Sequence, residues 1–233
     1  MIRVFIFVIV FLTLLILYVR YIERHGIFFP SKDITSTPDQ IGLNYEDVYV
    51  RTSDGWKLNA WFVPSAIGTS TVLYLHGNAG NMGDRLAKLK LFHELGLNTF
   101  IIDYRGYGRS EGSPNEFGLY LDAQAALQYL VHGRGIDPKS VIVYGASLGG
   151  APAVDLASKY SVGALVVDSS FSSAEDMAKV IYPFVPSFLI SIKLDNIGKI
   201  NQIAGAKLFI HSRDDEVVPY FLGREIIRCR PAA

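Results

Sequence analysis

The chain has 233 residues, half of them hydrophobic, and its 22 basic and 22 acidic side chains leave no formal net charge. This length suits one sizeable domain, and the absence of a long basic run argues against nucleic acid as a partner. The single cysteine, Cys229, cannot form an internal disulfide. No histidine–cysteine cluster of the metal-binding type occurs, so we expect neither a metal nor a cofactor.

The N-terminus is an apolar run. Residues 4–19 are interrupted only by Thr13, and arginines stand on both sides of the run. With its apolar neighbours the run reaches the ~20 residues that span a bilayer, and flanking arginines can snorkel to the headgroups. The small residues that favour signal-peptide cleavage are absent at its exit, although a retained signal peptide is the alternative. We therefore expect residues 1–24 to be an uncleaved transmembrane anchor; the flanking charges leave the side of the membrane open.

Turn formers dominate residues 25–44, which predicts a tether between the anchor and the domain. The segment 45–50 then alternates polar and apolar residues at period two, and 56–63 returns after Asp54-Gly55. An Asp-Gly pair between two such segments predicts a β-hairpin.

From Thr71 onward, strands and helices are predicted to alternate. Short runs that are apolar on both faces are typical of buried parallel strands; they occur at 71–75, 98–103, 141–144, 164–168 and 207–210. Helical segments follow: one to about Leu95, one after the capping box Ser113-Pro114-Asn115-Glu116, one after Ser147 and one from about Pro219. This α/β pattern predicts a mostly parallel sheet with helices on both faces.

Four polar clusters follow predicted strands, at 76–81, 103–112, 145–149 and 211–216. Because ligands bind at the carboxyl ends of parallel strands, these clusters predict an active site at one edge of the sheet. We interpret Arg105 and Arg109, within the second cluster, as donors that order their loop; contact with an anionic substrate group is the alternative.

The third cluster, Gly145-Ala146-Ser147-Leu148-Gly149, joins a buried strand to an Ala-rich helix. Side chains at Gly145 and Gly149 would crowd such a sharp turn. The turn pushes Ser147 out at the N-terminus of a helix, where unpaired N–H groups favour a developing negative charge. The pattern therefore predicts a nucleophilic serine.

Together, Asp54-Gly55 and the clusters that begin at His76, Asp103 and Gly145 resemble the α/β-hydrolase superfamily over nearly the whole chain. They resemble specifically its single-pass, membrane-anchored serine hydrolases of the esterase, thioesterase and lysophospholipase type. The resemblance implies an α/β-hydrolase fold for residues 45–233, with a small cap at about 171–199. It also implies hydrolysis of a carboxylic ester or thioester of a small-molecule or lipid acyl substrate.

The resemblance also implies a role for individual residues. Ser147 would be the nucleophile, and the backbone N–H groups of Asn78 and Leu148 would form the oxyanion hole. Asp215, in the pattern Asp-x-x-Val-Pro, matches the triad acid. Two other carboxylates are alternative acids: Asp214 and Asp168.

The triad histidine should follow the acid in this family, but the last histidine, His211, precedes Asp215. The predicted helix takes up most of the residues after Asp215, and the tail 229–233 predicts neither a strand nor a cap. We therefore expect the final strand and its histidine loop to be missing from a truncated chain. His76 and His211, near the predicted site, are the alternative bases.

Two other functions stay open at this point. A chain without the triad histidine could be a catalytically impaired hydrolase, or a non-catalytic pseudoenzyme or binding domain. A serine peptidase-like hydrolase of the same fold is the third reading, since no residue distinguishes it. The oligomeric state is not predicted. Residues 171–199 could likewise be an acyl-binding lid or a simple hydrophobic cap.

Overall fold

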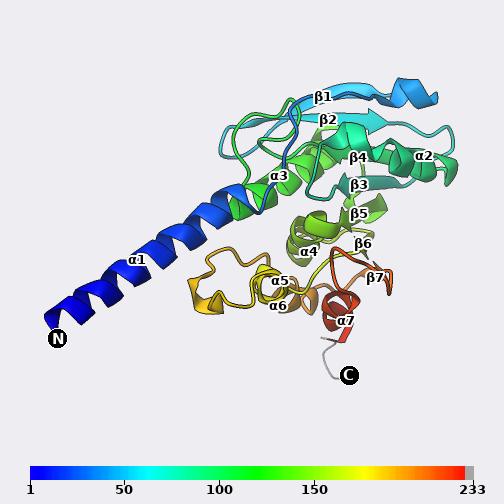
Figure 1. Cartoon of the computed structure of the whole chain (residues 1–233). Helices are drawn as coiled ribbons and strands as arrows, with labels where there is room; N and C mark the ends of the chain where they lie inside the picture. The colour runs from blue at the N-terminus through cyan, green and yellow to red at the C-terminus, as the bar shows by residue number, and fades with distance from the viewer. Residues whose placement is uncertain (229–233) are drawn as a thin grey trace.

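The computed structural model describes residues 1–228, without the side chains of Arg24 and His25. The tail 229–233, for which the sequence predicts neither strand nor cap, lies outside the described residues. Helix α1 (Ile2–His25) extends as a long rod from one side of an α/β domain (Figure 1). Most of its side chains are exposed, and Ile2–Glu23 is long and apolar enough to cross a membrane.

Within the described residues the strands form one sheet in the order β1-β2-β4-β3-β5-β6-β7. Their bounds are β1 (Glu46–Arg51), β2 (Lys57–Val63), β3 (Thr71–Leu75), β4 (Asn98–Ile102), β5 (Val141–Ala146), β6 (Ala164–Asp168) and β7 (Ala206–Ile210). The β1–β2 and β2–β4 pairs are antiparallel, and all other pairs are parallel. The predicted hairpin followed by a mostly parallel sheet is confirmed.

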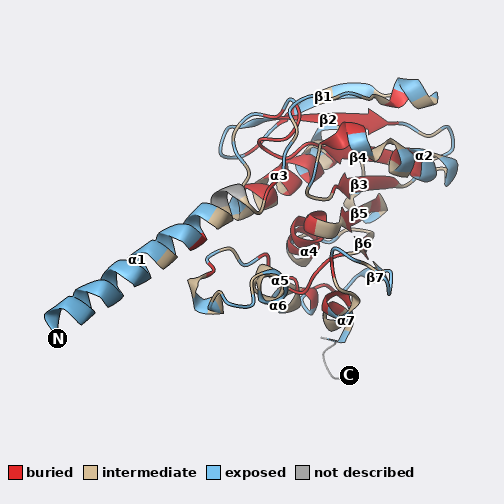
Figure 2. Ribbon diagram, in the orientation of Figure 1, coloured by how far each residue is buried: buried red, intermediate tan, exposed pale blue. Residues whose placement is uncertain are grey.

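Helices cover both faces of the sheet, as the alternation predicts. On one face, α2 (Leu86–Glu94) packs Phe92 edge-on against Tyr74 and Tyr144. On the other, α3 (Glu116–Gln128), α4 (Gly150–Lys159) and α7 (Tyr220–Arg228) bury apolar side chains in a second core. The inner strands β2, β3, β4 and β5 are largely buried, whereas the edge strands β1 and β7 are mostly exposed (Figure 2). Burial on both faces explains why apolar residues of β3 occur on both of its sides, from Val72 to Leu75.

The segment 25–44 packs on the domain, which differs from the tether that its turn formers predict. Phe28 and Leu43 are buried. Backbone hydrogen bonds join Ser31 to Gly80 at 3.0 Å and Gly108 to Ser31 at 2.8 Å. Turn-forming residues predict local backbone geometry, but they do not predict whether the turns pack against the rest of the domain. The segment therefore fixes the end of α1 relative to two of the strand-end loops.

Helix α3 begins two residues later than its predicted capping box. Asn115, rather than Ser113, is the N-cap, and its Oδ1 accepts from the Gly118 N–H at 2.8 Å. Asparagine is as good an N-cap as serine, so the local signal for the two positions is similar. Glu116 is thereby free for another contact: its carboxylate accepts from the backbone N–H groups of Lys193 and Leu194, both at 2.7 Å.

The region 171–199, which the resemblance implies to be a small cap, contains two α-helices: α5 (Ala174–Ile181) and the short α6 (Ile197–Ile200). Ser173 caps α5, since its hydroxyl accepts from the Asp176 N–H at 3.1 Å. A serine followed three residues later by a carboxylate is a recognisable signal for the start of a helix. The later residues Pro183 and Pro186 argue against a long helix in this region, so the signal is easily overlooked.

Candidate active site

Ser147 lies on a sharp turn between β5 and α4. Its φ of +49° is left-handed, a conformation that costs an L-residue about 1–2 kcal/mol. The turn is tight because a side chain at Gly149 would overlap the carbonyl of Leu75, and one at Gly145 would overlap the carbonyl of Gly149. The crowding expected at these two glycines is therefore observed.

A buried serine supports this turn from the neighbouring strand end. Ser170 Oγ donates to the carbonyl oxygen of Ser147 at 2.8 Å, and Ser170 is almost fully buried. Asn196 holds the same segment, because its Nδ2 donates to the carbonyl of Phe171 at 2.7 Å. The strained backbone of Ser147 is thus held directly by Ser170 and indirectly by Asn196, through the segment that carries Ser170. The sequence predicted neither contact.

The two predicted oxyanion donors come together with Ser147. Asn78 and Leu148 line the same pocket as Ser147, and a Cβ at Gly77 would lie 3.5 Å from the Ser147 Cβ. Within residues 1–228, neither the Asn78 N–H nor the Leu148 N–H donates a hydrogen bond to a backbone carbonyl of a loop, turn or helix cap. Two N–H groups beside a serine hydroxyl have the composition of an oxyanion site.

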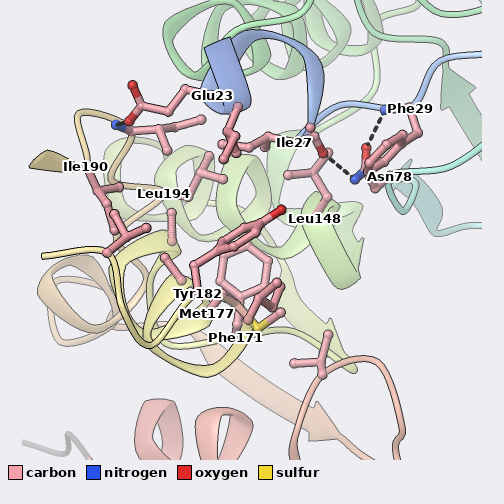
Figure 3. A pocket seen from close by; sticks show the side chains of 18 of the residues that line it. Glu23, Ile27, Phe29, Asn78, Leu148, Phe171, Met177, Tyr182, Ile190 and Leu194 are labelled. Atoms are coloured by element: carbon pink, nitrogen blue, oxygen red, sulfur yellow. Dashed lines mark hydrogen bonds between the residues drawn. The ribbon is translucent and has the colours of Figure 1, made fainter. Parts of the chain in front are cut away.

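The side chain of Asn78 fixes its own loop. Its Nδ2 donates to the carbonyl of Ile27 at 2.5 Å, and its Oδ1 accepts from the Phe29 N–H at 3.1 Å and the Tyr107 hydroxyl at 2.9 Å (Figure 3). Burial raises the pKa of Tyr107, so its hydroxyl stays protonated and can donate. Asn78 therefore ties the chain that leaves α1 to the predicted oxyanion loop.

An apolar pocket of about 290 Å³ opens at Ser147. One wall is the end of α1 and the residues after it, and the opposite wall is α5 with the segment after it (Figure 3). Leu148, Phe171, Met177, Tyr182 and Leu194 lie around the cavity in this view. Among its described lining residues the only ionisable carboxyl belongs to Glu23. Such a pocket suits an apolar chain with one polar end at the serine.

Glu23 joins α1 to the cap, which the sequence did not indicate. Its carboxylate accepts from the Ser191 N–H at 2.5 Å, the Ser191 hydroxyl at 2.7 Å and the Ile192 N–H at 3.2 Å. A hydrophobicity pattern cannot predict this contact, since the partners are 168 residues apart.

Of the three candidate acids, Asp215 has the shortest sequence separation from a residue that lines the pocket. Its Oδ1 accepts from the N–H groups of Val217 and Val218 at 3.0 and 2.8 Å, and both valines line the pocket. Asp168 lies instead on the face of α2, where its Oδ2 accepts from Lys88 Nζ at 3.1 Å and from the Tyr144 hydroxyl. The side chain of Asp214 is exposed.

The two alternative bases are engaged elsewhere. His76 is fully buried, with Nδ1 2.7 Å from the carbonyl oxygen of Gly77 and Nε2 3.3 Å from Asp103 Oδ1. The Nε2 of His211 lies 2.8 Å from the carbonyl oxygen of Val218 and 3.5 Å from Asp215 Oδ2. Among the described side chains, no histidine ring is hydrogen-bonded to the Ser147 hydroxyl.

Both arginines of the second cluster make structural ion pairs. Arg105 is buried between Asp122 and Asp54, and Arg109 Nη1 lies 3.1 Å from Asp47 Oδ2. These contacts agree with the interpretation of the two side chains as donors that order the loop.

The strain at Ser147 predicts a difference between two substitutions. Ser147→Gly should be about 1 kcal/mol more stable than Ser147→Ala, because only glycine adopts a positive φ without a steric cost. For a domain of this size that corresponds to a melting temperature about 2–4 °C higher. Thermal unfolding of both variants in one detergent checks this; equal melting temperatures would mean that the position is unstrained.

Comparison with known proteins shows what the fold and sequence resemble. Residues 70–195 match the family model described as alpha/beta hydrolase fold. The chain is 37% identical over 201 residues to protein bem46 of Schizosaccharomyces pombe, covering 81% of this chain and 67% of that protein. It is 38% identical over 211 residues to the alpha/beta hydrolase domain-containing protein WAV2 of Arabidopsis thaliana, covering 82% and 68% of the two chains.

A third relative and one solved structure extend the comparison. The uncharacterized membrane protein YNL320W of Saccharomyces cerevisiae is 33% identical over 225 residues, covering 91% of this chain and 79% of that protein. The Pyrococcus furiosus esterase Pf2001 superposes with a TM-score of 0.72 at 22% identity, covering 86% of this chain and 84% of the esterase. At that identity the structural likeness shows the shared fold alone.

Proposed function

Since the chain belongs to the α/β-hydrolase family, we propose that it is a membrane-anchored serine hydrolase that transfers an acyl group from an ester or thioester to water. The observation that carries the proposal is the strained Ser147 in an apolar pocket. The Asn78 and Leu148 N–H groups beside it supply the second requirement of acyl transfer, which is stabilisation of the oxyanion.

In this proposal Ser147 Oγ attacks the acyl carbon, the oxyanion accepts from the N–H groups of Asn78 and Leu148, and the alcohol or thiol leaves. Water then releases the acid from the acyl-enzyme. Both steps need a base to take a proton, and Asp215 is the carboxylate that would orient it. The contacts of His76 and His211 support neither ring as that base.

The acyl group is proposed to lie in the apolar pocket. A cavity of about 290 Å³ lined by apolar side chains suits an acyl chain of medium length better than a two-carbon acyl group. We expect a fluorescent decanoyl probe to be displaced more effectively by octanoate than by acetate.

A pocket-filling variant tests the placement of the acyl chain. Ala178 lines the pocket on α5, so Ala178→Phe should weaken octanoate binding at least tenfold. The matched control is Ala204→Phe, outside this pocket, which should leave octanoate binding unchanged. Equal octanoate affinity in wild type and Ala178→Phe would remove the acyl pocket from the proposal.

The anchor is the second part of the proposal. Its support is the exposed apolar span Ile2–Glu23, together with the relative from Saccharomyces cerevisiae that is called a membrane protein. The full chain should stay with the membrane pellet in high salt and in alkaline carbonate, because a spanning helix is held by its apolar area rather than by charge. Its release by either wash would contradict the anchor.

An acyl-binding protein without turnover is the competing function. The observation that favours it is the lack of a described histidine at the Ser147 hydroxyl. The two functions share the pocket and differ in chemistry: only the hydrolase forms a covalent acyl group on Ser147.

A further inference from the structure

The end of the anchor helix lines the same pocket as the cap. Val19 is only 4% exposed, whereas the helix before it is largely exposed. Val19 and Ile22 share the pocket wall with Tyr182, Val185 and Ile190 of the cap. The pocket of Ser147 is therefore bounded directly by residues of the apolar span.

The same cap carries apolar side chains that point away from the protein. Phe184 is 74% exposed and Phe188 is 83% exposed, and Ile181 at the end of α5 is also exposed. We call these three residues the cap edge. Large exposed apolar groups gathered in one short segment mark an interaction surface rather than ordinary solvent exposure.

The position of α1 identifies what this surface meets. Val19 precedes Glu23, the last residue of the span, by four residues, which is about 6 Å along a helix. The cap residues that share the pocket wall with Val19 therefore lie close to the end of the span, where it enters the membrane interface. Figure 1 shows the segment after α5 projecting beyond the rest of the domain on the side toward the N-terminus of α1.

We propose that the cap edge inserts into the bilayer interface, so that the pocket of Ser147 takes its acyl chain from the membrane. This inference rests on the proposed function, in which α1 spans the bilayer and Ser147 acts on an acyl group. Aromatic and aliphatic side chains partition into the headgroup–acyl boundary, and the span holds the cap edge beside it. The substrate class is then an amphiphile with one acyl chain, already dissolved in the bilayer.

The charges nearby agree with this orientation. Lys179 in the last turn of α5 pairs with Glu175 at 3.3 Å and with Asp176 at 3.0 Å. The two carboxylates of the first turn therefore neutralise its charge. The whole segment 181–192, which contains the cap edge, carries no charged side chain. The bilayer interface is accordingly met by apolar groups, and the polar face of α5 stays in water.

Fluorescence quenching tests the insertion in the full chain. With Cys229→Ser as background, Phe188→Cys carries an NBD label in phosphatidylcholine vesicles that contain nitroxide lipids. The matched control is Ile67→Cys, an exposed position in the loop after β2, at the end of the domain remote from α1 (Figure 1). We expect at least threefold stronger quenching at position 188 than at position 67.

Two other measurements separate the ways in which the proposal can fail. Equal quenching at both positions, in protein that resists carbonate extraction, overturns insertion of the cap edge but leaves the anchor standing. Release by carbonate overturns the anchor and, with it, this inference. The label at position 188 could instead be shielded from the nitroxide lipids. If that shielding is lost when the protein is diluted with lipid, a second copy of the chain covers the cap edge, and the proposal is again wrong.

Discussion

Extending the chain beyond residue 233 by a strand and a histidine-bearing loop should raise Ser147-dependent hydrolysis of p-nitrophenyl octanoate by up to about 10⁶-fold. Because no described histidine ring is hydrogen-bonded to the Ser147 hydroxyl, the chain of 233 residues should hydrolyse the same ester barely above background. A serine without its base keeps the oxyanion donors, and these alone leave roughly 10³–10⁴-fold acceleration over water. The difference of about 10⁶ corresponds to about 8 kcal/mol of activation free energy.

The geometry of the sheet specifies the design of that extension. β7 is the edge strand in the described sheet, and Asp215 lies in the loop after it. Carboxyl ends of parallel strands meet at one edge, so a loop after a strand paired with β7 would reach Asp215. Ser147→Ala in the extended chain, and the extension with glutamine in place of its histidine, are the matched controls.

Efficient Ser147-dependent turnover by the chain without the extension would contradict this expectation. It would require His76 or His211 to leave its present contact with the carbonyl of Gly77 or Val218. Substituting each histidine by glutamine would then identify the base.

Asp122→Ala should destabilise the fold by about 3–5 kcal/mol, because it leaves a buried arginine without its main partner. Asp122 is fully buried, and its carboxylate accepts from Arg105 Nε at 3.0 Å, Nη2 at 2.8 Å and the backbone N–H at 2.8 Å. Replacing Asp122 therefore leaves the buried guanidinium of Arg105, whose side chain is only 4% exposed, without this carboxylate partner.

The matched control uses the second partner of the same arginine. The carboxylate of Asp54 is 35% exposed, so Asp54→Ala should cost about 1 kcal/mol or less, as partly solvated ion pairs do. Removing both buried charges in Arg105→Met with Asp122→Leu should recover much of the loss. Denaturant unfolding of the three variants checks this order, which equal effects of the two aspartate substitutions would refute.

The pair also matters for the candidate site. Arg105 lies near the start of the loop that carries Tyr107. The Tyr107 hydroxyl donates to Asn78 Oδ1. Weakening the loop should therefore reduce ligand binding in the pocket before it unfolds the sheet.

Local patterns predicted those parts of the fold that neighbouring residues determine. The strand 71–75 carries apolar residues on both faces because it is buried along its whole length. The turn at Ser147 is tight because Gly145 and Gly149 leave room for the backbone. The same logic failed at Asn115, where two adequate caps lie two residues apart and the long-range contacts of Glu116 favour the second.

Contacts between distant segments could not be predicted in this way. Glu23 is a charged residue at the end of an apolar run, and its sequence context suggests only a membrane flank. Its bonds to Ser191 depend on how the cap folds back over α1. Ser170, which supports the Ser147 carbonyl, is similarly one of several serines after a strand, and only the packing distinguishes it.

Peptide mapping of a covalent adduct tests the central proposal most directly. The extended chain is incubated with a fluorophosphonate bearing an octyl chain, digested, and analysed by mass spectrometry; the chain of 233 residues is treated in parallel for a longer time. We predict one adduct, on Ser147, which forms rapidly in the extended chain and slowly in the shorter one. An adduct on a neighbouring serine such as Ser170, or an unmodified Ser147 in the extended chain, would contradict the proposed hydrolase.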